Sequence, residues 1–251
     1  MHHWTDEALI LDVAKFGDAD ALVQLFTPQH GVCRGIVKRG FSGKGRADLQ
    51  PATQAQVQWK ARLPEHMGTV TLEGSHGFGP RVMHDPLRLA AIGSACALTA
   101  RCVADHDPHP ELYYALLAFM KHVAAGVEKR IWLAEYVRLE LALLELAGFG
   151  LDLSQCAATG ETEELVYVSP KTGRAVSRAA GLPYHDRLLA LPHFLLVAEE
   201  LPDNVQEVAH GLALTGHFIE TRLLPALHRH TPMLRGHFCQ LLQRQGAVET
   251  H

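Results

Sequence analysis

The sequence of 251 residues contains no run of about eighteen uninterrupted apolar residues, the length that a membrane-spanning helix needs. Its N-terminus lacks the charged segment followed by an apolar segment that marks a secretory signal. The five cysteines are an odd number, and their spacings do not resemble a disulfide framework. These absences predict a soluble protein of the reducing cytoplasm with no membrane partner.

Motifs of the common enzyme classes are missing as well. There is no HExxH metal motif, no GxSxG nucleophile turn and no pairing of cysteine with histidine that suggests acyl chemistry. Gly43-Lys44 is not a phosphate loop, because only two residues separate Gly40 from Gly43 and a glycine follows Lys44 where Ser or Thr would hold magnesium. We therefore expect no enzyme and no cofactor.

Histidine, in contrast, is abundant, with 17 in the chain. Five of them gather near the C-terminus: His210, His217, His228, His230 and His237. His210 and His217 lie about two helical turns apart, too far to bind one ion directly. We expect surface or partly packed imidazoles and no metal site, and a metal-dependent enzyme that uses these histidines is the weaker alternative.

The charge balance restricts where an anion could bind. A formal net charge of −4 argues against a wholly basic nucleic-acid binder, so any anion-binding face must be local. The segment from Thr27 to Ala47 carries basic residues and no acidic residue. An apolar fraction of 47% with 20% charged residues is ordinary for a globular protein with a sizeable core.

Residues 1–80 read as one small β domain. Short strands are predicted at 8–13, 21–26, 32–38, 54–60 and 68–73, separated by turn residues. In 54–60 the alternation sends Ala55, Val57 and Trp59 to a core face, and the glutamines and Lys60 to a wet face. Five short strands in about seventy residues predict a closed or nearly closed barrel of the OB type.

Residues 81–251 have the periodicity of helices. Helices are predicted at 87–104, 111–125, 128–147, 186–200, 204–224 and 233–245, with Asp203 and Asn204 as capping residues for the fifth. The segment Gly74 to Pro86, rich in glycine and proline, is the expected domain junction. The fold class is therefore α+β: an N-terminal OB-fold barrel followed by an α-helical bundle.

A short insert at about 150–180 interrupts the helices. It offers Cys156, a turn at Thr159-Gly160, a β-rich run over 165–168 and a second turn over 170–173. A zinc ribbon needs a pair of cysteines at each of two such turns, and here only one cysteine is present. We expect a zinc-ribbon remnant without metal, held by packing of Val166, Tyr167 and Val168 against the helices.

The basic segment is the candidate binding site for nucleic acid. Its members are Arg34, Lys38, Arg39, Lys44 and Arg46, with Phe41 as a ring that could stack on a base and Lys60 on the wet face of the barrel. On the third strand Arg34 and Lys38 should project together from the surface. The alternative is a flexible, solvated hairpin tip.

A second basic group lies on the helix predicted from Glu128. Lys129, Arg130 and Arg138 stand close to an apolar stripe, an arrangement that could receive an acidic peptide with an aromatic end. The alternative is a surface helix with pairs such as Glu135 with Arg138.

Two stretches resemble the bacterial RecO family over about residues 4–245. The first is WTDEALILDVAKFGDADALVQLFTPQHGVCRGIVKRG with its basic glycine loop. The second is ELALLELAGFGLDLSQCAATG followed by LVYVSPKTGRAVS and LLALPHFLL. The resemblance implies an OB fold and a helical domain, and in many members a cysteine-ligated zinc site, of which this chain matches only Cys156.

The family resemblance also implies a function. It is that of a non-catalytic recombination mediator in DNA repair, which binds single- and double-stranded DNA and anneals complementary strands. In the RecFOR pathway such a protein binds the C-terminal tail of SSB and works with RecR to load RecA, in the cytoplasm at the nucleoid. The competing hypothesis is a protein-interaction scaffold whose OB domain does not bind DNA.

Overall fold

The computed structural model describes residues 2–42, 49–63 and 66–249. The chain divides into two compact units, Met1–Gly126 and Val127–His251, which are described separately below. Within the described residues no helix is both long enough and apolar enough to cross a membrane.

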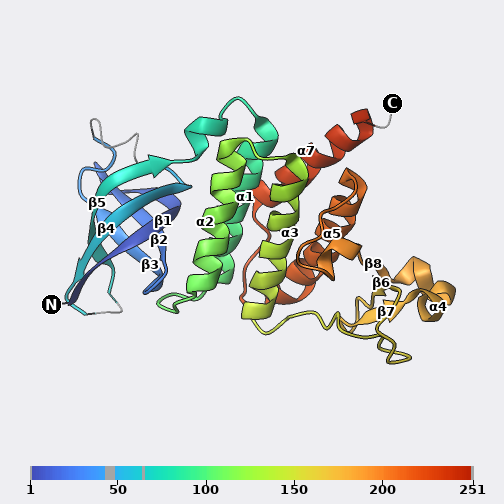
Figure 1. Ribbon diagram of the computed structural model, residues 1–251. Coiled ribbons are helices and arrows are strands. Elements are labelled where there is room, and N and C mark those ends of the chain that lie inside the picture. Colours follow the sequence, from blue (N-terminus) through green and yellow to red (C-terminus); the bar gives the residue numbers. More distant parts are fainter. Residues whose placement is uncertain (1, 43–48, 64–65, 250–251) are drawn as a thin grey trace. The chain divides into compact units, whose positions relative to one another are not determined.

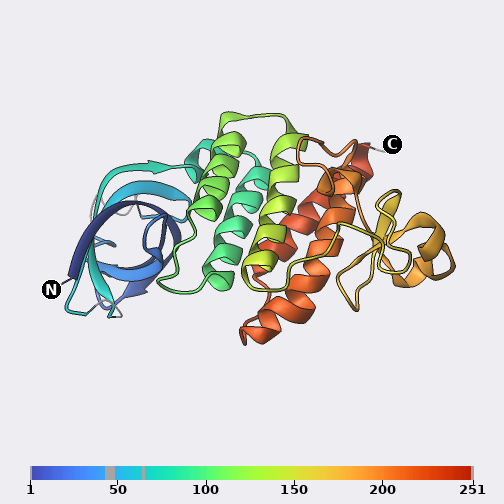
Figure 2. The same ribbon diagram turned by 60° about the horizontal axis from the view of Figure 1, so that its bottom comes forward.

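The first unit contains a closed barrel of five strands (Figures 1 and 2). The strands are β1 (His2–Phe16), β2 (Asp20–Thr27), β3 (Gly31–Val37), β4 (Thr53–Ala61) and β5 (Gly68–Gly77). They close in the order β1-β2-β3-β5-β4, and only the β3 and β5 pair is parallel. The predicted OB-type barrel is confirmed.

Strand β1 closes the barrel by pairing on both sides. Its first half pairs with β4, with Trp4 opposite Trp59, and its second half pairs with β2, with Phe16 opposite Asp20. The predicted alternation in β4 is also confirmed, because Ala55, Val57 and Trp59 are buried in the barrel core. Strand β5 continues past the predicted end at Glu73. Its pairing with β4 is irregular there, and Gly74 takes φ +62°.

Three helical segments complete the first unit. They are the 3₁₀-helix η2 (Gly79–Val82) and the helices α1 (Pro86–Cys102) and α2 (Pro110–Ala125). Asp85 caps α1 by accepting the N–H groups of Leu87 and Arg88, and Pro86 occupies the first turn, where its missing N–H costs nothing. Helix α2 ends at Gly126, whose φ of +76° suits the position after a helix.

Helices α1 and α2 pack with the barrel. Gln24 Nε2 on β2 donates to the carbonyl of Ala100 at 3.0 Å, and the rings of Phe26 and Tyr113 meet edge to face. Residue 80, the expected domain boundary, thus lies where the chain changes from strands to helices, whereas the compact units divide after Gly126. The expected boundary stays a prediction.

The second unit is built on helices α3 (Lys129–Leu146), α5 (Val205–Phe218) and α7 (Met233–Glu249), with α5 packed against both of the others. Asn204 caps α5 by accepting the N–H of Glu207, so this predicted capping residue is confirmed. Asp203 takes part through its backbone N–H, which the Glu207 carboxylate accepts. Beyond α5 the chain continues as a π-helical turn, η5 (Ile219–Leu223), and the short α6 (Leu224–Ala226).

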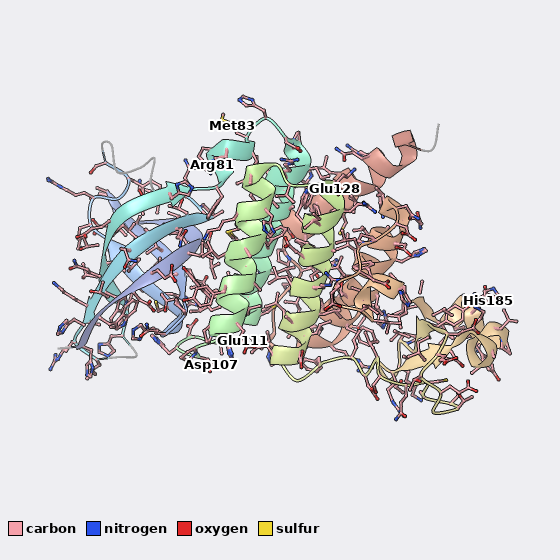
Figure 3. All side chains as sticks on the ribbon, viewed as in Figure 1. Arg81, Met83, Asp107, Glu111, Glu128 and His185 are labelled. Carbon is pink, nitrogen blue, oxygen red and sulfur yellow. The ribbon has the colours of Figure 1, made fainter. Side chains whose placement is uncertain are left out.

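The insert forms a small three-stranded sheet in the order β7-β6-β8. Strand β6 (Leu165–Val168) lies between β7 (Ala175–Ser177) and β8 (Leu189–Ala190), and α4 (Arg178–Gly181) and the 3₁₀-helix η3 (Leu182–Arg187) connect the last two. Of the three residues expected to hold the ribbon, Val168 is fully buried and Val166 and Tyr167 are half-buried. Figure 3 shows His185 of η3 projecting from the outer part of the insert.

The helix predicted at 186–200 is wrong. The segment instead contains the end of η3, strand β8 and a 3₁₀-turn, η4 (His193–Leu195). Pro192 explains the difference, because it has no N–H to donate and its ring disfavours a helical conformation at Leu191. Leu191 therefore stays extended, and its N–H bonds to the carbonyl of Val166 on β6.

Cys156 is buried beside β7. Its Sγ accepts the N–H of Ser177 at 3.2 Å. Burial acts to raise the pKa of this thiol, but hydrogen bonds from Ser177, Thr159 and nearby backbone amides lower it to about 6. In the described residues, no group of three or more His, Cys, Asp and Glu side chains is arranged to hold a metal ion.

Candidate nucleic-acid interface

A carboxylate holds the basic residues where the β1–β2 turn meets the end of β3. Lys38 Nζ lies 2.7 Å from Asp20 Oδ2, and the backbone N–H of Arg39 donates to Asp20 Oδ1 at 2.9 Å. The hydrogen bonds from Lys38 and Arg39 lower the pKa of Asp20. Lys38 is two-thirds exposed, with a side-chain accessibility of 67%, so a solvent anion can compete with Asp20 for its ammonium.

Arg34 shares the outer face of β3 with this group, as predicted, but lies nearer the helices. It stands opposite Gln24 on β2, and its Nη2 is 3.6 Å from Asp105 Oδ2. Both side chains are nearly half exposed. The segment that is basic in sequence is thus partly neutralised in space by Asp20 and Asp105, which lie outside it.

Besides the predicted Phe41, a second aromatic residue lies at this end of the barrel. Phe41 is half-buried, and its side chain packs against the barrel core, which leaves less of the ring for stacking on a base. Phe16, at the end of β1 and opposite Asp20, is 42% exposed, and Lys15 beside it is also exposed. Lys15 and Phe16 lie between the first two predicted strands, where the sequence indicates only a turn. The loop between the first two strands of an OB fold is nevertheless a common binding element.

Lys60 is separated from β3 by one strand, because it pairs with Thr69 on β5, which in turn pairs with Ile36 on β3. On β4, Lys60 pairs with His3 near the start of β1, whereas Asp20 pairs with Phe16 at the end of β1. The structure therefore brings together Lys38 and Arg39, places Arg34 farther along β3, and places Lys60 on β4, with β5 between it and β3. Lys44 and Arg46 lie outside the described residues.

Comparison with known proteins places this barrel and the helices after it in one family. A family model described as Recombination protein O N terminal matches residues 1–78, and one described as Recombination protein O C terminal matches residues 83–230. The chain belongs to the RecO family. A DNA repair protein RecO of Rhodospirillum centenum is 45% identical over 94% of this chain and 92% of its own length.

Other RecO relatives match along nearly the whole chain. The DNA repair protein RecO of Rhodospirillum rubrum is 41% identical over 99% of this chain and 100% of its own length. That of Phenylobacterium zucineum is 44% identical over 92% of this chain and 93% of its own length.

In the second unit of this RecO chain, the three basic residues predicted to bind a peptide have different surroundings. Arg138 reaches across to the segment after the insert, where its Nη2 donates to the carbonyls of Phe194, Val197 and Glu200 at 2.6 to 3.2 Å. Arg130 is exposed and pairs with Glu128 at 2.7 Å, and Lys129 is half-buried. Arg138 therefore fixes the local fold, whereas Arg130 lies exposed in an ion pair at the start of α3.

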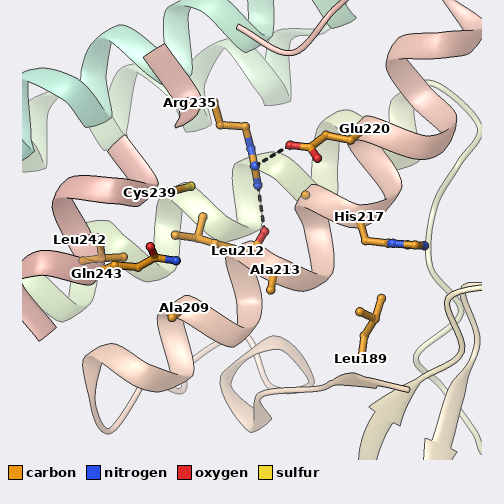
Figure 4. A pocket seen from close by; sticks show the side chains of 11 residues that line it. Leu189, Ala209, Leu212, Ala213, His217, Glu220, Arg235, Cys239, Leu242 and Gln243 are labelled. Carbon is orange, nitrogen blue, oxygen red and sulfur yellow. Dashed lines mark hydrogen bonds and ion pairs between the residues drawn. The ribbon is translucent and has the colours of Figure 1, made fainter. Parts of the chain in front are cut away.

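The second unit also contains a hollow of about 370 Å³ lined by α5, η5 and α7 (Figure 4). Arg235 forms part of its wall, donating to the carbonyl of Leu212 and lying 3.5 Å from Glu220. The same guanidinium makes a two-pronged ion pair with Glu140 of α3, at 2.7 and 3.0 Å, and Thr215 also donates to Glu140. Arg235 is thus already paired with two carboxylates, which does not favour binding of an anionic ligand at this wall.

Proposed function

We propose that this RecO chain is a non-catalytic recombination mediator in DNA repair that binds single- and double-stranded DNA through the end of its barrel. The observation that carries the proposal is a group of exposed side chains at that end. Lys15, Phe16, Lys38 and Arg39 lie together at the β1–β2 turn and the end of β3. They combine positive charge with a ring, the two features that hold single strands on OB folds.

Binding of this kind depends on the phosphates. Lysine and arginine at an exposed surface neutralise phosphate charges whatever the bases are, so binding is almost blind to sequence and falls steeply with salt. Two strands brought to one positive surface repel each other less, and their local concentration rises. We propose that this is sufficient for strand annealing, without any covalent step.

The partners follow from the family. We infer that the chain works with RecR, meets the SSB tail and so promotes RecA loading on SSB-coated strands. The proposal is supported by Lys129 and Arg130 at the start of α3, basic residues that suit the acidic part of such a tail. Arg138, with its three carbonyl partners, is the least suitable of the three predicted residues.

Asp20 provides a direct test of DNA binding, because its carboxylate pairs with the ammonium of Lys38 as a DNA phosphate would. Asp20→Asn removes the competing charge but keeps an oxygen that can accept the N–H of Arg39. Exposed ion pairs are weak. We therefore expect affinity for a single-stranded oligonucleotide at low salt to rise about two- to fivefold, measured by fluorescence anisotropy.

The matched control for this variant is Asp18→Asn, which makes the same charge change at an exposed residue in the same turn. It should raise affinity less, because Asp18 makes no hydrogen bond or ion pair with Lys38 within the described contacts. Equal gains in the two variants would show that overall charge, and not release of Lys38, governs binding.

A further inference from the structure

The end of the barrel away from Lys38 contains a cavity with an unusual lining. It has a volume of about 510 Å³ and is lined by His2, His3, Trp4, His30, Trp59 and His106, among others. All of these residues belong to the first unit. The volume lies in the range typical of small-molecule sites, several hundred Å³, and rings make up most of the wall.

Three of these rings form a stacked column. The rings of Trp4 and His30 lie 4.2 Å apart at 14°, and those of Trp4 and Trp59 lie 5.5 Å apart at 10°. The barrel fixes the two tryptophans, because they are paired across β1 and β4 and the Nε1 of Trp59 donates to the carbonyl of Arg34 at 3.1 Å. The outermost member, His30, sits on the β2–β3 turn, whose backbone is held by Thr27.

The turn that carries His30 is rigid as well. Asp6 accepts the N–H of Gln29 at 3.1 Å. Gly31 takes φ +65° and lies so close to the backbone of Asp107 that any Cβ would clash. A flat ligand that enters the cavity therefore meets rings that are already in place, which reduces the entropy lost on binding.

The charge around the cavity fits a strand of nucleic acid. Lys60 lies opposite His3 on the neighbouring strand, and Arg62 follows β4; both side chains are exposed. The nearby acids already have partners. Asp6 accepts two backbone N–H groups, and Asp107 pairs with His109 at 2.9 Å. A phosphate beside Lys60 and Arg62 would leave its base within reach of the column.

We propose that this cavity binds an unstacked nucleobase of single-stranded DNA, which continues the Trp4–His30 column. The inference rests on the proposed DNA binding by the barrel and adds a second, base-dependent contact at the end opposite Lys38. Lys60, which pairs with His3 of the cavity lining, contributes its charge to this second contact. Because bases in a duplex are stacked on each other, the cavity distinguishes single strands from duplexes.

The test uses the full-length protein at pH 8. Burial lowers the pKa of His30, so its imidazole is neutral there and a change at this position alters stacking and not charge. His30→Ala should lower affinity for a single-stranded oligonucleotide about five- to hundredfold, since a stacked base contributes about 1–3 kcal/mol. Affinity for a duplex, and for an oligonucleotide of the same length without bases, should not change.

Two further variants isolate the ring. His30→Phe keeps a flat ring and should restore most of the affinity. His76→Ala removes an exposed histidine at the other end of β4 and β5, opposite Gln54, and should bind like the wild type. If His30→Ala binds normal single strands as well as the wild type, or loses equally on the base-free strand, the cavity does not bind a base. If the wild type binds neither strand, the proposed DNA binding itself is wrong.

Discussion

Replacing Arg34, Lys38 and Arg39 by glutamate together is expected to abolish strand annealing and to lower DNA affinity about a hundredfold or more at low salt. Each lost phosphate contact removes about 0.9 from the slope of log affinity against log salt, so the slope should become shallower by nearly three. The measurement is anisotropy titration of a labelled oligonucleotide at several salt concentrations, with annealing followed in parallel.

The loss of DNA affinity in this triple variant has to be distinguished from a loss caused by unfolding. The three side chains are exposed, and such substitutions usually change stability little. However, the new glutamates would repel Asp20 and Asp105. The variant with glutamine at the same three positions therefore serves as a second test and should lose DNA affinity to a smaller degree. A variant with Arg81→Glu and Lys121→Glu, exposed residues of the same unit, controls for overall charge and should bind nearly normally.

The same triple variant separates the two proposed binding regions. An acidic peptide with an aromatic C-terminal residue should bind it as well as the wild type, because that contact is proposed at Lys129 and Arg130 in the second unit. Lys129→Glu with Arg130→Glu should show the reverse pattern, with peptide binding lost and DNA binding kept. If the peptide binds both variants as tightly as the wild type, Lys129 and Arg130 do not form its binding site.

Arg235→Met is expected to destabilise the second unit by about 3–5 kcal/mol, the cost of leaving a buried carboxylate without its partner. Glu140 is fully buried, Arg235 is 5% exposed, and their ion pair joins α3 to α7. Adding Glu140→Leu to Arg235→Met should recover most of the loss, because replacing both charges by apolar groups of similar size removes the unpaired charge. Urea denaturation measures both changes.

The matched control for the buried pair is Arg244→Met, at an exposed position on the same helix. It should change stability by less than about 0.5 kcal/mol, as surface substitutions usually do. If Arg235→Met were no more destabilising than Arg244→Met, the buried ion pair would not be a main support of this unit. DNA binding by the barrel should be unaffected in all of these variants.

Much of the fold could be read from the sequence because its signals are local. The alternation around Val57 gave the core face of β4, and Asp203 with Asn204 marked the start of α5. The helix predicted at 186–200 was wrong because that prediction relied on the spacing of apolar residues and disregarded Pro192. There a proline and a pairing with β6, contributed by residues distant in sequence, decide the structure.

The candidate site was harder to predict because it depends on the register in which the strands of the barrel pair. Counting charges along the chain found Lys38 and Arg39, but Asp20 and Asp105 meet the basic residues only in the folded barrel. The position of Lys60 relative to Lys38 likewise depends on pairing that the sequence does not show, since β5 lies between β4 and β3. The column of Trp4, His30 and Trp59 joins two strands and a turn and has no sequence motif at all.

The central claim is that the barrel binds DNA through its phosphates, and the salt dependence of binding tests it most directly. Wild-type protein is titrated with labelled single-stranded and duplex oligonucleotides of unrelated sequences, with and without a metal chelator. We expect a steep linear fall of log affinity with log salt, nearly the same for every sequence and unchanged by the chelator. Binding that is absent at low salt, or indifferent to salt, would contradict the account and favour a scaffold whose barrel does not bind DNA.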